Sequence, residues 1–444
     1  MKLWDKGIDI SGDIEAFTVG QDRQLDLRLA KQDVWGSLAH ITMLESIGLL
    51  KEQERATLHE ALLDILNTIS QGQFKIDDQT EDVHSQIEFM LTEKLGEVGK
   101  KIHSGRSRND QVLVDIKLFL RDQIKELTYA IQDLCSALLE LSEAHREVII
   151  PGYTHMQAAM PSSFGLWFGA FAETLADDLL MLRASYQMVN QNPLGSAAGY
   201  GNSFPLDRQL TTKLLGFEDL HTNVVAAQMS RGKSEASVSF SLASVAATLG
   251  RMAMDICLYN SQNYGFLSFP GHITTGSSIM PHKKNPDVFE LIRGRCNLIQ
   301  QLPAQLMAIT LNLPSGYHRD LQLTKELIIP GIDQLRDILK ITTSTLTQVE
   351  VNGKIMDDPK YDLIYSVENV NLQVLQGIPF RDAYQQVAAE IDKGIFKPKK
   401  DLQHTHLGSI GNLGTEVIRK KITKVVDGFD FEIADKAIKD LEAR

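Results

Sequence analysis

The most regular hydrophobic pattern in the chain lies between Arg106 and Pro151, a stretch in which neither glycine nor proline occurs. Apolar residues recur there at steps of three and four, which is the spacing of one face of an α-helix. They are Leu113, Ile116, Leu120, Ile124, Leu127, Ile131, Leu134, Leu138 and Leu141. The pattern predicts one helix of about 35 residues, roughly 50 Å long at 1.5 Å per residue. A helix this long must lie in a bundle that extends beyond one small core.

Other segments carry helical patterns as well, whereas the alternation typical of strands is nearly absent. Early in the chain we expect helices near 33–50 and 51–69, followed by one that Thr80 caps and that runs to Leu95. The later expected helices are 162–189, 232–262, 287–311 and 320–349. The predicted fold class is therefore all-α, with long helices.

The length of 444 residues and the change of pattern along the chain predict three domains. Residues 1–110 mix short helical patterns with glycine breaks and suggest a mostly helical N-terminal domain. Residues 111–356 hold the long patterns and predict a central long-helix bundle domain. From Asp357 the patterns shorten and glycine and proline breaks return, so residues 357–444 are expected to form a small C-terminal helical domain.

Composition and motifs exclude several classes of protein. With 43% hydrophobic and 23% charged residues, no apolar run near the roughly 18–20 residues of a membrane span and no signal-peptide core, the chain is expected to be cytoplasmic. Its three cysteines are expected to be reduced and buried. The net charge of −12 argues against nucleic-acid binding. Because P-loop, dinucleotide, HExxH, paired CxxC and Gly-x-Ser-x-Gly motifs are missing, we expect no cofactor and no metal.

The segment 271–287 is polar, contains glycine and has no acidic residue before Asp287. It runs into a helix start that Asn285 is expected to cap and whose positive end Asp287 favours. The segment offers the serine hydroxyls of Ser277 and its neighbour Ser278, and the ammonium groups of Lys283 and its neighbour Lys284. Beside unpaired helix N–H groups this arrangement suits an anion, although composition alone leaves a plain loop as the alternative.

Three further loops carry candidate residues, each with a plainer alternative. A lone loop histidine such as His155 is more often structural than catalytic, unless a carboxylate such as Glu290 orients it. Segment 98–109 has four Lys/Arg and no acid, so it is either a solvated basic loop or a turn that presents arginines to carboxylates. The glycines of 192–201 can bring backbone N–H groups near a ligand, but a turn of small residues is the simpler interpretation.

The sequence of segment 276–287, Gly-Ser-Ser-Ile-Met-Pro-His-Lys-Lys-Asn-Pro-Asp, resembles the signature loop of the aspartase/fumarase superfamily. Within that superfamily, Ser-Gly-Arg-Ser-Arg-Asn-Asp-Gln at 104–111 resembles the first active-site segment of argininosuccinate lyases. Segments 152–157, 192–196, 317–322 and 378–383 fit the same family. The matches extend from about Asp33 to Ala383 and so cover all three expected domains.

The resemblance implies a carbon–nitrogen lyase that needs no cofactor and splits argininosuccinate reversibly into L-arginine and fumarate, the last step of arginine biosynthesis. The reaction forms an aci-carboxylate, which fixed cations and N–H donors stabilise. Lys283, Asn285 and the helix N-terminus match the family positions for this role. Ser277 would be the base in a loop that closes over the site, and His155 the acid for the leaving nitrogen. The alternative base is His155 with Glu290 as its orienter.

The resemblance also implies which residues hold the substrate. The fumaryl carboxylates would contact Ser107, Arg108, Asn109 and Thr154; the arginine-side part would contact Tyr317, Gln322 and Lys325; and Asp82, His84 and Arg231 would line the same cleft. The implied assembly is a homotetramer whose central helices form a 20-helix core and whose active sites combine loops of three subunits. The alternative is an ordinary bundle with each site inside one subunit.

Three positions depart from the pattern of argininosuccinate lyases. Asp22 stands where the family often has serine, and Gly232 stands where an acid is usual, which puts the leaving-group pocket in question. His282 replaces a usual glutamine and is familiar from adenylosuccinate lyases. Adenylosuccinate lyase, or another fumarate-releasing lyase, is therefore the runner-up. A non-catalytic protein of the lens delta-crystallin kind is the alternative from a different class.

Overall fold

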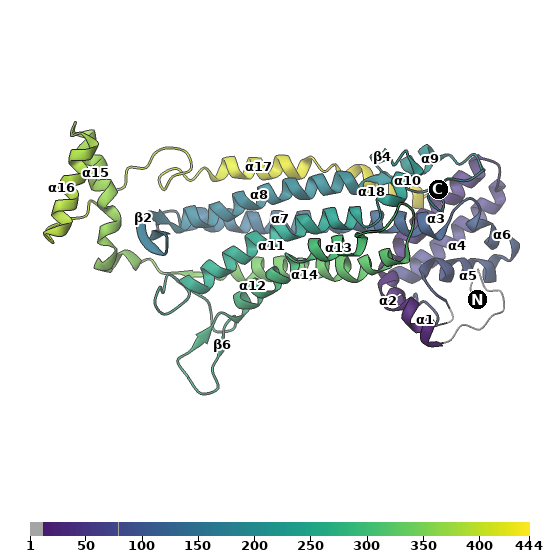
Figure 1. Ribbon diagram of the computed structural model, residues 1–444, viewed down its shortest axis with the longest axis horizontal. Helices are drawn as coiled ribbons and strands as arrows, with labels where there is room; N and C mark the ends of the chain where they lie inside the picture. The colour runs from purple at the N-terminus through teal and green to yellow at the C-terminus, as the bar shows by residue number, and fades with distance from the viewer. Residues whose placement is uncertain (1–11, 79) are drawn as a thin grey trace.

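The computed structural model describes residues 12–78 and 80–444. The all-α prediction is confirmed: long helices run side by side along an elongated bundle, with the N-terminal helices gathered at one end (Figure 1). The N-terminal helices are α1 (Gly12–Val19), α2 (Asp22–Asp26), α3 (Ala30–Ser46), α4 (Glu52–Ser70), α5 (Val83–Leu95) and α6 (Glu97–Lys100), with 3-10 turns η1 (Leu27–Leu29) and η2 (Lys101–His103).

The bundle is built on α7 (Arg108–Ala144), which confirms the long helix that the hydrophobic pattern predicts. Every residue of the predicted stripe is buried except Leu141, which is half-buried against the core. Helices that pack along α7 or continue the bundle are α8 (Phe164–Val189), α11 (Lys233–Tyr259), α12 (Asp287–Ile299), α13 (Leu302–Thr310) and α14 (Thr324–Leu346). The apolar length of α11 would suffice for a membrane span, but more than half of it is buried inside this bundle.

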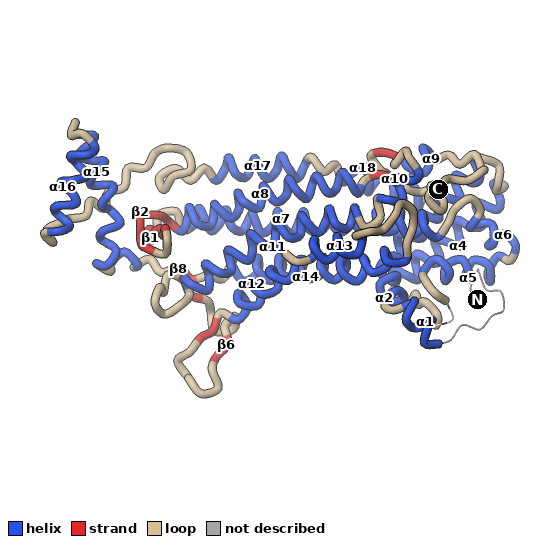
Figure 2. Tube along the Cα trace, viewed as in Figure 1, coloured by secondary structure: helices blue, strands red, loops and turns tan. Residues whose placement is uncertain are grey.

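Short paired strands and turns join the helices at their ends (Figure 2). The antiparallel pairs are β1 (Ile149–Thr154) with β2 (Gln157–Ser163), β5 (Leu267–Ser268) with β8 (Glu350–Val351), and β6 (Thr275–Gly276) with β7 (Lys284–Asn285). The parallel pair is β3 (Gln191–Asn192) with β4 (Asp219–Leu220). The remaining short elements here are α9 (Arg208–Leu214), α10 (Val224–Met229) and η3 (Arg319–Leu323).

The C-terminal region divides between a separate pair of helices and two helices that return to the bundle. After η4 (Ile355–Asp357) and η5 (Pro359–Tyr365), α15 (Ser366–Leu375) and α16 (Phe380–Asp392) pack on each other around a small apolar cluster of their own. In contrast, α17 (Thr415–Asp427) packs along α8 and α7, and α18 (Phe431–Glu442) packs against α3 and α9. The domain limits at 110/111 and 356/357 stay a prediction, and this packing favours a C-terminal unit smaller than 357–444.

Three local predictions are wrong, namely two helix caps and one helix length. The cap of α5 is Asp82, whose Oδ1 accepts from Ser85 N at 2.8 Å, while the hydroxyl of Thr80 donates to Asp77 O. Asn285 does not cap α12, since its backbone pairs with Thr275 in the β6–β7 ladder and α12 begins only at Asp287. The helix expected over 287–311 breaks into α12 and α13, the second with a proline in its first turn.

Candidate active site

A pocket with about 720 Å³ of empty space lies where α2, α5, α7, η3 and α14 meet. The sequence-predicted residues that line it are Asp82, His84, Arg108, Asn109, Arg231, Tyr317, Gln322 and Lys325. These residues come from segments up to 243 positions apart (325 − 82), and the fold brings them to one place. The structure therefore groups most of the predicted substrate-binding set within a single chain.

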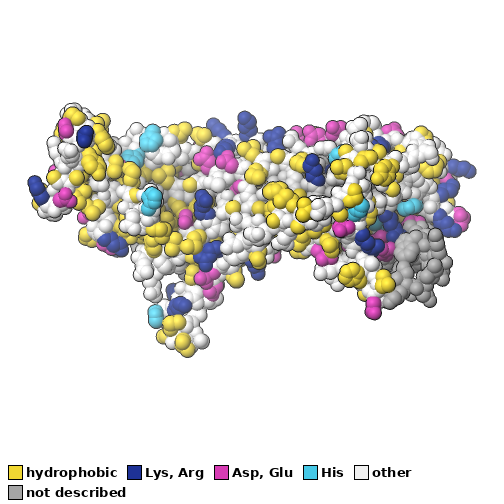
Figure 3. Space-filling model, viewed as in Figure 1, with side chains coloured by type: hydrophobic (Ala, Val, Ile, Leu, Met, Phe, Trp, Pro, Cys, Tyr) yellow, Lys and Arg dark blue, Asp and Glu magenta, His cyan; other side chains and the backbone are white. Residues whose placement is uncertain are grey.

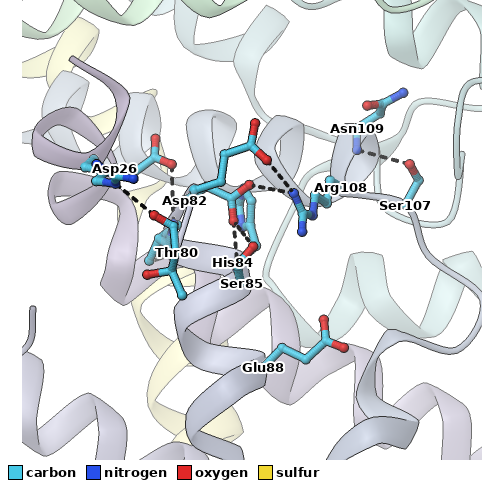
Figure 4. A network of polar contacts seen from close by, with 12 residues as sticks. Asp26, Thr80, Asp82, His84, Ser85, Glu88, Ser107, Arg108 and Asn109 are labelled. Atoms are coloured by element: carbon cyan, nitrogen blue, oxygen red, sulfur yellow. Dashed lines mark hydrogen bonds and ion pairs between the residues drawn. The ribbon is translucent and has the colours of Figure 1, made fainter. Parts of the chain in front are cut away.

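Two helix starts face each other across this pocket (Figure 4). Ser107 caps α7: its hydroxyl accepts from Asn109 N at 3.2 Å, so this residue serves the helix rather than the pocket wall. Arg108, the first residue of α7, reaches the cap of α5 and lies 3.2 Å from Asp82 Oδ2. Burial disfavours the charge of Asp82, but His84 and Arg108 outweigh it and hold the pKa of Asp82 below its usual value. Among the described residues, the buried Nη2 of Arg108 has no hydrogen-bond partner, so this donor is not used by the groups that hold Arg108 in place.

Lys325 forms two ion pairs in the pocket that are largely shielded from water. Its Nζ lies 2.5 Å from Asp26 Oδ1 and 2.7 Å from Asp22 Oδ1, with the lysine side chain only 4% exposed. Burial raises the pKa of Asp22 to about 6, Lys325 opposes this shift, and Asp26 adds to it. Asp22, a departure from the family pattern, is thus explained by its ion pair with a residue that the resemblance implies for substrate binding.

The second departure, Gly232, is explained by backbone and space. It has φ of 78° and precedes α11, and a Cβ at this position would lie 2.5 Å from Thr310 Cγ2. An aspartate there would strain the backbone, and the side chain of Thr310 would have to shift to admit its Cβ. Arg231 beside it is buried, and its guanidinium donates to Glu235 Oε1 at 2.9 Å and to Leu321 O at 2.9 Å. Arg231 therefore joins α11 to η3 at the pocket wall.

Sequence reasoning missed several acidic and basic neighbours in the pocket. Glu81 forms ion pairs with Arg319 at 2.8 Å and with Arg108 at 3.3 Å. All three of these side chains line the pocket. Gln322 already donates to Thr18 O at 3.1 Å. The signal for these two residues was their place in the chain, which is too weak to assign a role: Glu81 stands next to Asp82, and Arg319 lies within the matched segment 317–322.

In the small-residue turn at 192–201, two backbone N–H groups bind a side chain of the protein itself, which supports the structural interpretation. Gly195 N and Ala197 N donate to Asp110 Oδ2 at 2.9 and 2.8 Å. Asp110 Oδ1 accepts from Ser107 N at 2.8 Å. Asp110 therefore ties this turn to the start of α7, and those N–H groups are not directed at a ligand.

Thr154 is the last residue of β1 and His155 follows it in the turn before β2, at the end of the bundle opposite to α2 and α5, which line the pocket (Figure 1). Both side chains are exposed. His155 has φ of 52° and Met156 has φ of 60°, a left-handed pair that residues other than glycine and asparagine adopt at a cost of about 1–3 kcal/mol each. A two-residue hairpin loop requires a positive φ at both of its positions, so the β1–β2 turn itself accounts for this geometry, and the role of His155 stays a prediction.

The remaining predicted residues lie on the β6–β7 loop and the start of α12, which project from the side of the bundle (Figure 1). Ser277 Oγ accepts from Met280 N at 3.1 Å, and Lys283 is exposed. Glu290 is an exposed residue in the first turn of α12. Among the described residues, neither a hydrogen bond nor an ion pair joins Glu290 to His155, so this predicted pair is not formed inside one chain and stays a prediction.

Comparison with known proteins supplies the family. Residues 15–300 match the model of a lyase family. Argininosuccinate lyase of Bacteroides fragilis is 56% identical over 443 residues, covering 100% of this chain and 99% of that protein. The argininosuccinate lyase of Thermotoga neapolitana is 40% identical over 387 residues, covering 87% of this chain and 97% of that protein.

The chain belongs to the argininosuccinate lyase family. Solved structures agree with the fold of this family member. An EDDS lyase in complex with formate has a TM-score of 0.80 at 22% identity, covering 97% of this chain and 93% of that one. A fumarate lyase:delta crystallin from Brucella melitensis in native form has a TM-score of 0.70 at 20% identity, covering 87% and 92%. The predicted membership of the aspartase/fumarase superfamily is confirmed.

Proposed function

We propose that this chain is a carbon–nitrogen lyase that splits argininosuccinate reversibly into L-arginine and fumarate. The observation that carries the proposal is the 56% identity to argininosuccinate lyase over the whole chain. The pocket adds support, because Arg108, Arg319 and Lys325 offer cations to a substrate with several carboxylates, while Glu81 and Asp82 offer acceptors to its cationic nitrogens.

The proposed mechanism is a β-elimination in which each predicted residue has one task. Ser277 removes a proton from the carbon beside a carboxylate, and the C–H electron pair moves into that carboxylate to give the aci form. Lys283 and the N–H groups near Asn285 stabilise the added negative charge. When the double bond forms, the C–N bond breaks and its electron pair passes to the guanidinium nitrogen, which His155 protonates. The products are fumarate and arginine.

We further propose that the site is completed by other subunits of a homotetramer. The pocket, the His155 turn and the Ser277 loop lie at separate places on one subunit (Figure 1). Large apolar side chains are exposed along the bundle, where hydrophobic groups gather on the visible face (Figure 3). They include Leu180, Met181, Phe240, Met254, Leu291, Leu298 and Met307. A partner bundle would cover them. A cytoplasmic location, with no membrane or nucleic-acid partner, completes the proposal.

A substrate panel tests the proposal. The pure protein is incubated separately with argininosuccinate, adenylosuccinate, malate and aspartate, and fumarate is measured. We expect fumarate from argininosuccinate. Fumarate from adenylosuccinate alone would favour the runner-up and give weight to His282, an exposed residue of the β6–β7 loop. Equal inactivity of wild type and Ser277→Ala on all four substrates would favour the non-catalytic alternative.

A further inference from the structure

Three titratable side chains meet in a buried group next to the pocket: Asp33 of α3, His84 of α5 and Asp115 of α7. Nδ1 of His84 lies 3.0 Å from Asp33 Oδ1 and 3.4 Å from Asp115 Oδ2. Both aspartates have no exposed surface, whereas His84 is 6% exposed and lines the pocket. Because Nδ1 faces the two carboxyl groups, Nε2 is the ring nitrogen left for the pocket.

The surroundings of the ring favour its charged form. Burial disfavours an imidazolium, but Asp33, followed by Asp82 and Asp26, outweighs burial and raises the pKa of His84 above its usual value. In an imidazolium both ring nitrogens carry hydrogen, so Nδ1 donates to Asp33 and Nε2 can donate to a ligand. His84 therefore presents a charged donor at a pocket that receives an anionic substrate.

The two aspartates differ in charge although both are fully buried. Asp33 Oδ1 also accepts from Gln111 Nε2 at 2.6 Å. Burial opposes the charge of Asp33, but His84 and Arg106 hold its pKa below the usual value. For Asp115, burial and the neighbouring Asp33 raise the pKa well above the usual value. Among the described residues, neither oxygen of Asp115 accepts a hydrogen bond, and His84 Nδ1 comes only to 3.4 Å, whereas a proton on Asp115 lets it donate to Asp33.

We propose that Asp33 and Asp115 are positioning residues for His84: the carboxylate of Asp33 fixes the imidazolium so that its Nε2–H donates to a carboxylate of the substrate, and the neutral acid of Asp115 holds Asp33 in place. This inference rests on the proposed function, because it assigns a role within the same site. It adds two residues from α3 and α7 that do not line the pocket.

A divalent cation is the competing occupant of the same group, because one imidazole and two carboxylates are common metal ligands. The geometry favours the hydrogen-bonded arrangement of Asp115, Asp33 and His84, here called the relay. Nδ1 and Oδ1 stand at hydrogen-bond distance, and the ring nitrogen that a metal would need is already directed at Asp33. The two alternatives make different predictions for the two aspartates.

The test compares Asp33→Asn with Asp115→Asn, two substitutions of the same size at fully buried positions of one cluster. Asp33→Asn removes the charge that holds the imidazolium, so kcat/KM for argininosuccinate should fall by about tenfold to a hundredfold near neutral pH, the range for one hydrogen bond to a charged group. The loss should shrink as pH falls, because acid restores the charge of His84. Asp115→Asn should change kcat/KM less than about threefold, since an amide can donate to Asp33 as the neutral acid does.

A second readout does not depend on activity. The pKa of His84 is measured by NMR on histidine-labelled protein, with the signal assigned by its loss in His84→Gln. It should lie above the usual value in wild type and in Asp115→Asn, and should fall in Asp33→Asn. The titratable and charged groups around the ring that enter this titration are Asp26, Asp33, Asp82, His103, Arg106 and Asp115. In the His84→Gln background, Asp33→Asn should cost no further activity, because Asp33 acts through His84.

Several results would overturn the relay. They are equal losses in the two aspartate variants with an unchanged pKa of His84, full activity of Asp33→Asn, or one equivalent of bound metal whose removal abolishes activity. If Asp33→Asn does not fold, the wild-type titration still decides, since a pKa of His84 at or below its usual value contradicts the proposal. If wild type leaves argininosuccinate intact, the proposed function fails while the NMR result still judges the relay.

Discussion

Nζ of Lys325 lies 2.5 Å from Oδ1 of Asp26, an ion pair between α14 and α2 that is almost wholly shielded from water. Removing one partner of a buried pair leaves the other charge without compensation, which costs about 3–5 kcal/mol. Lys325→Met should therefore lower the free energy of unfolding by about that amount and raise KM for argininosuccinate, both measured at matched protein concentration. The exposed Lys340 of the same helix provides the control, since Lys340→Met should stay within about 0.5 kcal/mol. Equal effects at the two positions would contradict this account.

The raised pKa of Asp22 makes the free energy of unfolding depend on pH in a direction that can be predicted. Its usual pKa is 3.8 and burial raises it to about 6, so the native chain binds this proton more tightly than the unfolded chain. The stability that this proton contributes is therefore present at low pH and is lost as pH rises through about 4 to 6. Asp22→Asn cannot titrate, so its free energy of unfolding relative to wild type should increase across that window, by at most about 3 kcal/mol. Urea unfolding at several pH values measures this difference, and a difference independent of pH would refute the assignment.

The strained turn at His155 predicts a separation of activity from stability. Asparagine tolerates a positive φ, so His155→Asn should leave the thermal midpoint nearly unchanged while lowering kcat by about 10²- to 10⁴-fold, and its pH–rate profile should lose one limb. Met156→Gly relieves the neighbouring strain and should raise stability by up to about 1 kcal/mol with activity retained. Should His155→Asn remain active, the histidine would not be the proton donor.

Ser277 and Ser278 form a matched pair for testing the base. Ser277→Ala should lower kcat by about 10²- to 10⁴-fold with substrate binding and assembly preserved, because it removes only the proton acceptor. Ser278 lies next to it on the same exposed loop, and Ser278→Ala should keep most of the activity. Pre-steady-state measurement of the chemical step compares the two. Substantial activity in Ser277→Ala would transfer the role of base to His155.

Periodicity predicted the bundle because a long apolar stripe has one simple solution, as the buried face of α7 shows. It failed where the decisive partner lies elsewhere in the chain. Asn285 looks like a cap locally, but its backbone pairs with Thr275 across the loop. The break between α12 and α13 had a local signal instead, since Pro303, in the first turn of α13, interrupts the pattern over 287–311.

The candidate site shows the same limit. Family motifs identified residues such as Arg108 and Lys325 because these stand in the matched segments. Asp33 and Asp115 could not be found in this way, because their importance rests on a contact with His84 that only the packing of α3, α5 and α7 creates. A single sequence does not show which residues on different helices will contact each other.

The central claim is that argininosuccinate is cleaved at sites that combine the pocket of one subunit with the Ser277 loop of another. The most direct measurement mixes two inactive variants, Ser277→Ala and Arg108→Met, under conditions in which subunits exchange, and follows fumarate release from argininosuccinate. If the two residues of each site come from different subunits, about a quarter of the sites in an equal random mixture carry both wild-type residues, so about a quarter of the wild-type activity should return. A mixture as inactive as its components would contradict the shared site.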